Sequence, residues 1–113
     1  MNDDERQFLL TAVWMFMRHG QPARARNLCE ALVEDEPRDG IAAVALAELL
    51  LDDGEAARAV EVLRAADVSP DLYHAEAVLE TRALRYLGRK DEAAARWQRY
   101  LEARKGAARQ WVG

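Results

Sequence analysis

Few side chains in this chain have the types and spacing that catalysis or metal binding requires. The two histidines, His19 and His74, stand far apart beside expected helix ends, where surface or capping roles are favoured. Asp52, Asp53 and Glu55 surround a glycine turn that could attract a cation. They lack the full ligand set of a calcium loop, so a solvated turn is the better interpretation. The sequence therefore predicts no enzyme, no cofactor and no metal site.

The only cysteine, Cys29, falls on the expected inner face of its helix without cationic neighbours there, which favours a buried structural thiol over a nucleophile. A single cysteine forms no internal disulfide, which fits a reducing cytoplasm. The acidic opening MNDDE is unlike a signal peptide, and no apolar run has the length of a membrane span. The net charge of −4 offers no basic face for nucleic acid. We expect a cytoplasmic protein that neither enters a membrane nor binds nucleic acid.

The first expected helix, about residues 5 to 19, carries more apolar side chains than a one-sided helix needs. Leu10, Trp14 and Met17 fall on a second apolar face. A contiguous exposed patch of this kind usually marks a partner site, which is the interpretation we favour. The alternative is that Trp14 and Met17 pack under Trp111 or within a homodimer.

Three glycines at a constant spacing define the elements that carry these side chains. Gly20, Gly54 and Gly88 recur with a period of about 34 residues, which is typical of tetratricopeptide repeats. A glycine supplies the positive φ that ends the first helix of a helix-turn-helix unit. A small residue stands at the same distance after each glycine, where the second helix packs on the first: Ala25, Ala59 and Ala93.

The predicted fold is all-α, with three tandem tetratricopeptide-like helix-turn-helix repeats forming a short right-handed solenoid. One domain covers residues 1–113, and its parts are units of about 6–39, 40–72 and 73–106 followed by a tail, 107–113. Asn2, Asp3 and Asp4 offer an N-cap and negative charge for the first turn of the first helix. Breaks between units are expected near Pro37 and Pro70.

Two features of unit three depart from the regular pattern. Glu80 and Thr81 stand where the repeat has a Leu-Gly pair, so the first helix of this unit is the least regular. Gly106 is expected to break the last helix, after which the tail folds back on the stack or frays.

In a stack of this type, the first helices of the units line a concave groove. The apolar side chains at the groove positions form a trough that ends at Arg82 and Arg85. Trp14, Met17 and Leu51 are predicted to contact a client, whereas Leu9, Phe16 and Leu50 hold the fold. The full set of predicted partner-binding residues is Leu10, Trp14, Met17, Ile41, Val44, Glu48, Leu51, Val78, Arg82 and Arg85.

Three stretches of the chain suggest a narrower relationship. The opening QFLLTAVW, the following HGQPARARNLCEALVEDEP and the closing ARWQRYLEARK resemble the YscY family, small tetratricopeptide-like chaperones of the type III secretion systems of bacterial virulence. The middle matches only in repeat pattern. The resemblance implies binding of a YscX-like protein, a small exported component of the apparatus, which is kept soluble until export. An export-gate component, and a second copy when the client is absent, are further partners considered.

Other functions share the same architecture. Needle-subunit chaperones and other type III secretion chaperones are the nearest alternatives. A generic tetratricopeptide scaffold that assembles with itself or with a larger complex is the next. Solubility without a co-expressed partner would favour the scaffold.

Overall fold

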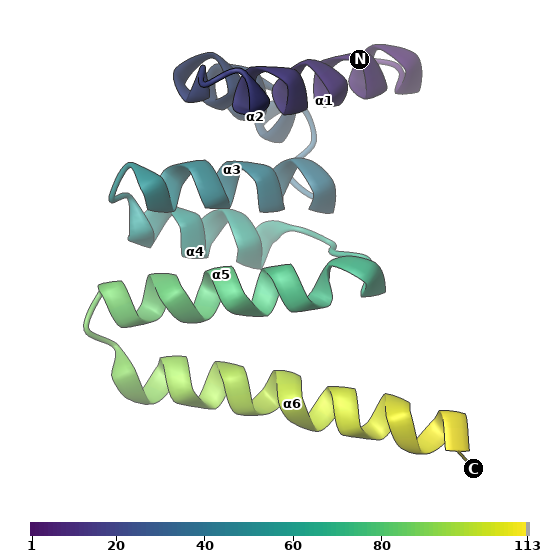
Figure 1. Cartoon of the computed structure of the whole chain (residues 1–113), viewed down its shortest axis with the longest axis vertical. Helices are drawn as coiled ribbons and strands as arrows, with labels where there is room; N and C mark the ends of the chain where they lie inside the picture. Colours follow the sequence, from purple (N-terminus) through teal and green to yellow (C-terminus); the bar gives the residue numbers. More distant parts are fainter. Residues whose placement is uncertain (113) are drawn as a thin grey trace.

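The computed structural model describes the backbone of residues 1–112 and the side chains of residues 1–110. Figure 1 shows the helices lying across the long axis, one after another, from α1 and α2 at one end to α6 at the other. Apart from one isolated bridge, the described residues form no β-structure, so the chain is an all-α tandem-repeat solenoid. The elements are α1 (Asp3–Arg18), α2 (Pro22–Asp35), α3 (Gly40–Asp52), α4 (Ala56–Ala65), a 3₁₀ turn η1 (Pro70–Leu72), α5 (Tyr73–Tyr86) and α6 (Lys90–Val112).

Consecutive helices pack as pairs, α1 with α2, α3 with α4 and α5 with α6, and α2–α3 and α4–α5 contacts join the pairs. A core runs along the stack because each helix turns an apolar stripe toward its neighbours. The alanines that follow the glycine turns, Ala25, Ala59 and Ala93, are buried as the repeat spacing predicted. The largest fully buried side chains are Leu32, Leu46, Leu50, Leu63, Leu84 and Cys29.

The three glycine turns share one backbone geometry. Gly20, Gly54 and Gly88 have φ of +69°, +77° and +76°, which confirms that the period marks the ends of α1, α3 and α5. The N–H after each glycine donates to a carbonyl oxygen in the last turn of the preceding helix, over 2.8 to 2.9 Å: Gln21 to Phe16, Glu55 to Leu50 and Arg89 to Leu84.

The segment that links α2 to α3 and the segment that links α4 to η1 contact each other through their backbones. The Asp67 N–H donates to the Arg38 carbonyl oxygen over 2.9 Å, and Asp39 and Asp67 form a parallel bridge. Gly40 lies in this contact: a Cβ at Gly40 would stand 2.8 Å from the Asp67 carbonyl oxygen and 2.9 Å from the Val68 Cα. The two segments can approach this closely because residue 40 has no side chain.

The start of the stack is capped and held by charge. Asn2 caps α1 as predicted, its side chain accepting from the Glu5 N–H over 2.8 Å. Arg6 of α1 donates to Asp35, at the end of α2, over 2.8 Å and to Asp39 over 2.6 Å. Asp39 also caps α3, so this ion cluster joins the first helix to the start of the second pair.

The expected break at Gly106 is wrong, because α6 continues through it to Val112. A glycine costs a helix only about 1 kcal/mol relative to alanine, and the good helix formers around Gly106 outweigh that cost. α4 is the shortest of the six helices in the described chain and ends at Ala65. Pro70 begins the 3₁₀ turn that leads into α5.

Candidate partner-binding groove

The first hollow on the stack lies between α1 and α3 and has a volume of about 380 Å³. Trp14 and Met15 of α1 line it and are 62% and 54% exposed, and Ile41 of α3, which lines it too, is also exposed. Leu10 and Met17 line the hollow while packing against the core. The Arg18 guanidinium lies 5.1 Å from the centroid of the Trp14 ring, and this cation–π contact holds the indole on the surface.

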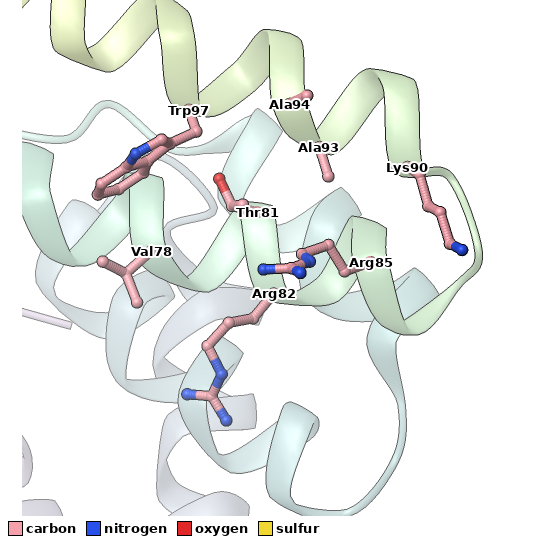
Figure 2. Close-up of a pocket in the computed structure, with 8 residues that line it drawn as sticks. All are labelled: Val78, Thr81, Arg82, Arg85, Lys90, Ala93, Ala94 and Trp97. Atoms are coloured by element: carbon pink, nitrogen blue, oxygen red, sulfur yellow. The ribbon is translucent and has the colours of Figure 1, made fainter.

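The second hollow lies between α5 and the first half of α6 and has a volume of about 620 Å³. Figure 2 shows Trp97 and Val78 at one end and Lys90 at the other, with Arg85 between them. Trp97 is half-buried and packs on Tyr100, with ring centroids 5.2 Å apart. This hollow therefore has an aromatic end and a basic end.

Comparison with known families bears on this stack directly. Residues 10–72, more than half of the chain, match the tetratricopeptide repeat. The chain belongs to the tetratricopeptide-repeat family. Proteins of this family are scaffolds for protein–protein interaction, and they carry no enzymatic chemistry. No curated protein matches the chain.

In this tetratricopeptide-repeat protein, the predicted partner-binding residues gather at two places. Those of the first hollow are Leu10, Trp14, Met17 and Ile41, and those of the second are Val78, Arg82 and Arg85. Val44, Glu48 and Leu51 line neither hollow: Val44 and Leu51 are half-buried against the core, and Glu48 is exposed. A single trough that joins the two hollows remains a prediction.

Sequence reasoning did not assign several of the residues that shape these surfaces. Trp97 occupies the repeat position of Cys29 and Leu63, which are both buried, yet it is half-buried at a hollow. Nothing in the sequence indicated that Lys90 belongs to a site, because its neighbours in sequence are charged and exposed. Phe8 and Met15 are among the most exposed apolar side chains of the described residues. The apolar residues at the same positions of the next repeat could have revealed their face.

The basic end of the second hollow is formed by cationic side chains that have no acidic partner among the described residues. Arg82, Arg85 and Lys90 form no ion pair within the described chain, although most other arginines of the stack do. The Oγ1 atom of Thr81, on the wall of this hollow, is buried without a hydrogen-bond partner among the described residues. In a chain of net charge −4, this leaves a local basic region with free hydrogen-bonding capacity.

The buried charge of α5 has a structural role. Glu80 accepts from Arg96 Nε over 2.7 Å and from Arg64 Nε over 3.0 Å, and so ties α5 to both α6 and α4. Burial raises the pKa of neighbouring Glu76, and Arg96 opposes that shift. The irregular position that the sequence showed in unit three is therefore a buried ion cluster.

The remaining reactive groups of the described chain are Cys29 and the two histidines. Burial, with a smaller contribution from Glu30, raises the pKa of Cys29 to about 12, so the thiol stays protonated at neutral pH. His19 is the exposed C-cap of α1, and His74 packs against Tyr100 with ring centroids 5.7 Å apart.

No group of three potential metal ligands occurs in the described part of the chain. None of its described helices is both long and apolar enough to span a membrane. Trp111 lies outside the residues whose side chains are described.

Proposed function

We propose that this tetratricopeptide-repeat protein is a cytoplasmic chaperone that holds an apolar segment of a partner in the groove beginning at Trp14. The exposed indole beside the first hollow is the observation that carries the proposal. A tryptophan side chain buries about 150–250 Å², so covering its exposed part contributes about 2–4 kcal/mol to binding at about 25 cal/mol per Å². Met17 lines the same hollow, and methionine adapts to irregular partner surfaces.

The partner that we propose is a YscX-like protein, a small exported component of a type III secretion system. The support is the resemblance of the opening and closing stretches to the YscY family. A client of this kind has apolar segments that aggregate when alone, and burial in a groove keeps them soluble. The basic end of the second hollow adds a requirement: the client segment should carry acidic residues where it passes Arg82 and Arg85.

Two variants separate binding from folding. Trp14→Ala should weaken client binding by about thirtyfold, equivalent to about 2 kcal/mol, because a central aromatic anchor is lost. It should change the free energy of unfolding by less than about 1 kcal/mol, because the side chain is mostly exposed. Leu50→Ala should destabilise the fold by about 2–5 kcal/mol, because Leu50 is fully buried.

The matched control is Tyr86→Ala, which removes an exposed aromatic ring of α5 that lines neither hollow. Calorimetric titration with the client and urea melts of each variant give the two free energies. Binding that survives Trp14→Ala contradicts the groove, and unfolding as severe as that of Leu50→Ala places Trp14 in the core.

The family match also favours a second function, a general interaction scaffold without a dedicated client. Co-purification from the native host, with identification of the bound protein by mass, distinguishes the two. A small exported secretion component supports the chaperone. A protein that is soluble and monodisperse alone, with no such component bound, supports the scaffold.

A further inference from the structure

A stripe of exposed side chains runs along the outer face of α1. Its members follow spacings of four, three, four and three residues, which is the pattern of a seam between two packed helices. Phe8 is 72% exposed and Met15 is 54% exposed, so the apolar pair of the stripe is uncovered. The stripe consists of Asp4, Phe8, Thr11, Met15 and Arg18, all of them exposed.

The repeat shows what this face does elsewhere in the stack. The residues that occupy the positions of Phe8 and Met15 in the second unit are Ala42 and Leu49, and both are buried. Ala83, which follows Leu49 at the same position of the third unit, is buried too. In α3 and α5 this face is covered because the preceding pair packs on it. In α1, no described part of the chain covers it.

The charges of the stripe are complementary to those of a second copy of itself. Asp4 stands at one end, and Arg18, whose guanidinium also lies 5.1 Å from the centroid of the Trp14 ring, stands at the other. Neither forms an ion pair within the described residues. When two such stripes lie antiparallel about Thr11, Asp4 faces Arg18 of the second copy and Phe8 faces its Met15. Antiparallel packing also sets each helix N-terminus beside a C-terminus, which the helix dipoles favour.

Among the side chains of α6 that the structure describes, residues 90–110, the far end of the stack offers no competing apolar surface. The exposed side of this part is polar, with Gln98 donating to Glu102 over 3.1 Å and Lys105 3.6 Å from Glu102. A head-to-tail array would place this polar side against Phe8 and Met15 and leave Asp4 and Arg18 without matched charges. A two-fold pairing covers the two apolar side chains and also pairs the two charges.

We propose that α1 packs antiparallel against α1 of a second copy, with the two-fold axis at Thr11, to form a homodimer. Two residues of this surface, Thr11 and Met15, also line the first hollow, so a client bound there would compete with the second copy. The pairing itself does not depend on the client. One helix pair is smaller than a standard protein interface, so the dissociation constant should fall in about the micromolar range.

Analytical ultracentrifugation of the full chain over a concentration series tests the pairing without any client. Wild type should shift from monomer to dimer as concentration rises. Asp4→Arg and Arg18→Asp should each weaken the dimer at least about tenfold, because each sets like charges opposite one another twice. The double variant, D4R/R18D, restores both pairs and should return to within about threefold of wild type. Circular dichroism confirms that each variant is folded.

Cysteine cross-linking tests the position of the axis. Thr11→Cys should cross-link rapidly with a short bismaleimide, because the two copies of residue 11 meet at the axis. Gln7→Cys is the control, since its two copies lie about 12 Å apart along the helices and should not react together. Cys29 is fully buried and does not interfere. A monomer at every concentration overturns the proposal and leaves the face to a helix of another protein. A charge swap that fails to restore the dimer, or equal cross-linking at both positions, overturns it as well.

Discussion

Removing the buried carboxylate of Glu80 is the sharpest test of how unit three is held together. Glu80 is buried between Arg96, which is nearly buried, and Arg64, whose side chain is 51% exposed. Glu80→Ala leaves Arg64 free to turn to water, but it leaves Arg96 with only Glu76 at 3.4 Å. The variant therefore creates a poorly compensated charge inside the protein.

The size of the effect follows from those exposures. Breaking a buried pair by removing one partner costs about 3–5 kcal/mol, and the contact with Glu76 offsets part of that, so Glu80→Ala should cost about 2–4 kcal/mol. Arg64→Ala should cost at most about 1 kcal/mol, because a half-exposed ion pair contributes little.

An all-apolar replacement should reverse the loss. The equivalents of Glu76, Glu80 and Arg96 lie one repeat earlier, in unit two, and are all buried apolar residues: Ala42, Leu46 and Val62. The triple variant Glu76→Ala, Glu80→Leu and Arg96→Val copies these types into unit three. It should be at least as stable as wild type, because replacing a complete buried ion cluster by apolar residues is often neutral or stabilising.

Urea melts followed by circular dichroism measure all of these free energies. A loss below about 1 kcal/mol for Glu80→Ala would show that the carboxylate is hydrated and the cluster unimportant. A triple variant as unstable as the single one would show that unit three needs the ions to hold its helices in place.

Three further predictions use the same melts. Ala59→Leu should cost about 1–3 kcal/mol by overpacking, and an unchanged midpoint would show that residue 59 is not in a close contact. Gly54→Ala should cost about 1–2 kcal/mol of unfolding free energy, because residue 54 has a positive φ. Gly40→Ala should cost more, because the added Cβ meets backbone atoms of Asp67 and Val68. A larger loss for Gly54→Ala than for Gly40→Ala would contradict this close approach. Hydrogen bonds from Arg58 lower the pKa of Glu30, so their stabilisation is present above the ordinary carboxyl pKa and is lost as the pH falls through the lowered value. Glu30→Gln should therefore flatten the acid side of the stability profile, and identical acid slopes would contradict this.

Much of the fold follows from spacing. The repeat period predicts the positive φ of Gly20 and the burial of Ala25 directly, because both depend on local structure within one unit. Gly40 is different, because its need for a missing side chain comes from a segment at the other end of its unit, and nothing near it in sequence shows that contact. The prediction of a helix break at Gly106 was wrong for a related reason. The low helix propensity of this one residue is outweighed by the good helix formers on both sides of it.

The candidate site was predicted less completely than the fold. The period assigns Trp14 and Arg82 to groove positions, but it does not tell that the hollows form at α1–α3 and α5–α6. Those depend on how far each side chain extends. Trp97 stands at a repeat position that is buried in the earlier units, as Cys29 and Leu63, yet it is only half-buried and lines a hollow.

The uneven burial along the stack has a consequence for motion. α3 contributes buried residues along its whole length, whereas Val13 is the one buried side chain of α1. Local opening should therefore require less free energy at α1 than at α3, which native-state hydrogen exchange would detect as earlier loss of the α1 amide protons. The link from Arg6 to Asp35 and Asp39 is ionic and partly solvated, so salt should lower that opening free energy further. A ligand bound on α1 would then protect the amides of this helix far more than those of α3, and ionic strength would set how strongly the binding helix is held closed.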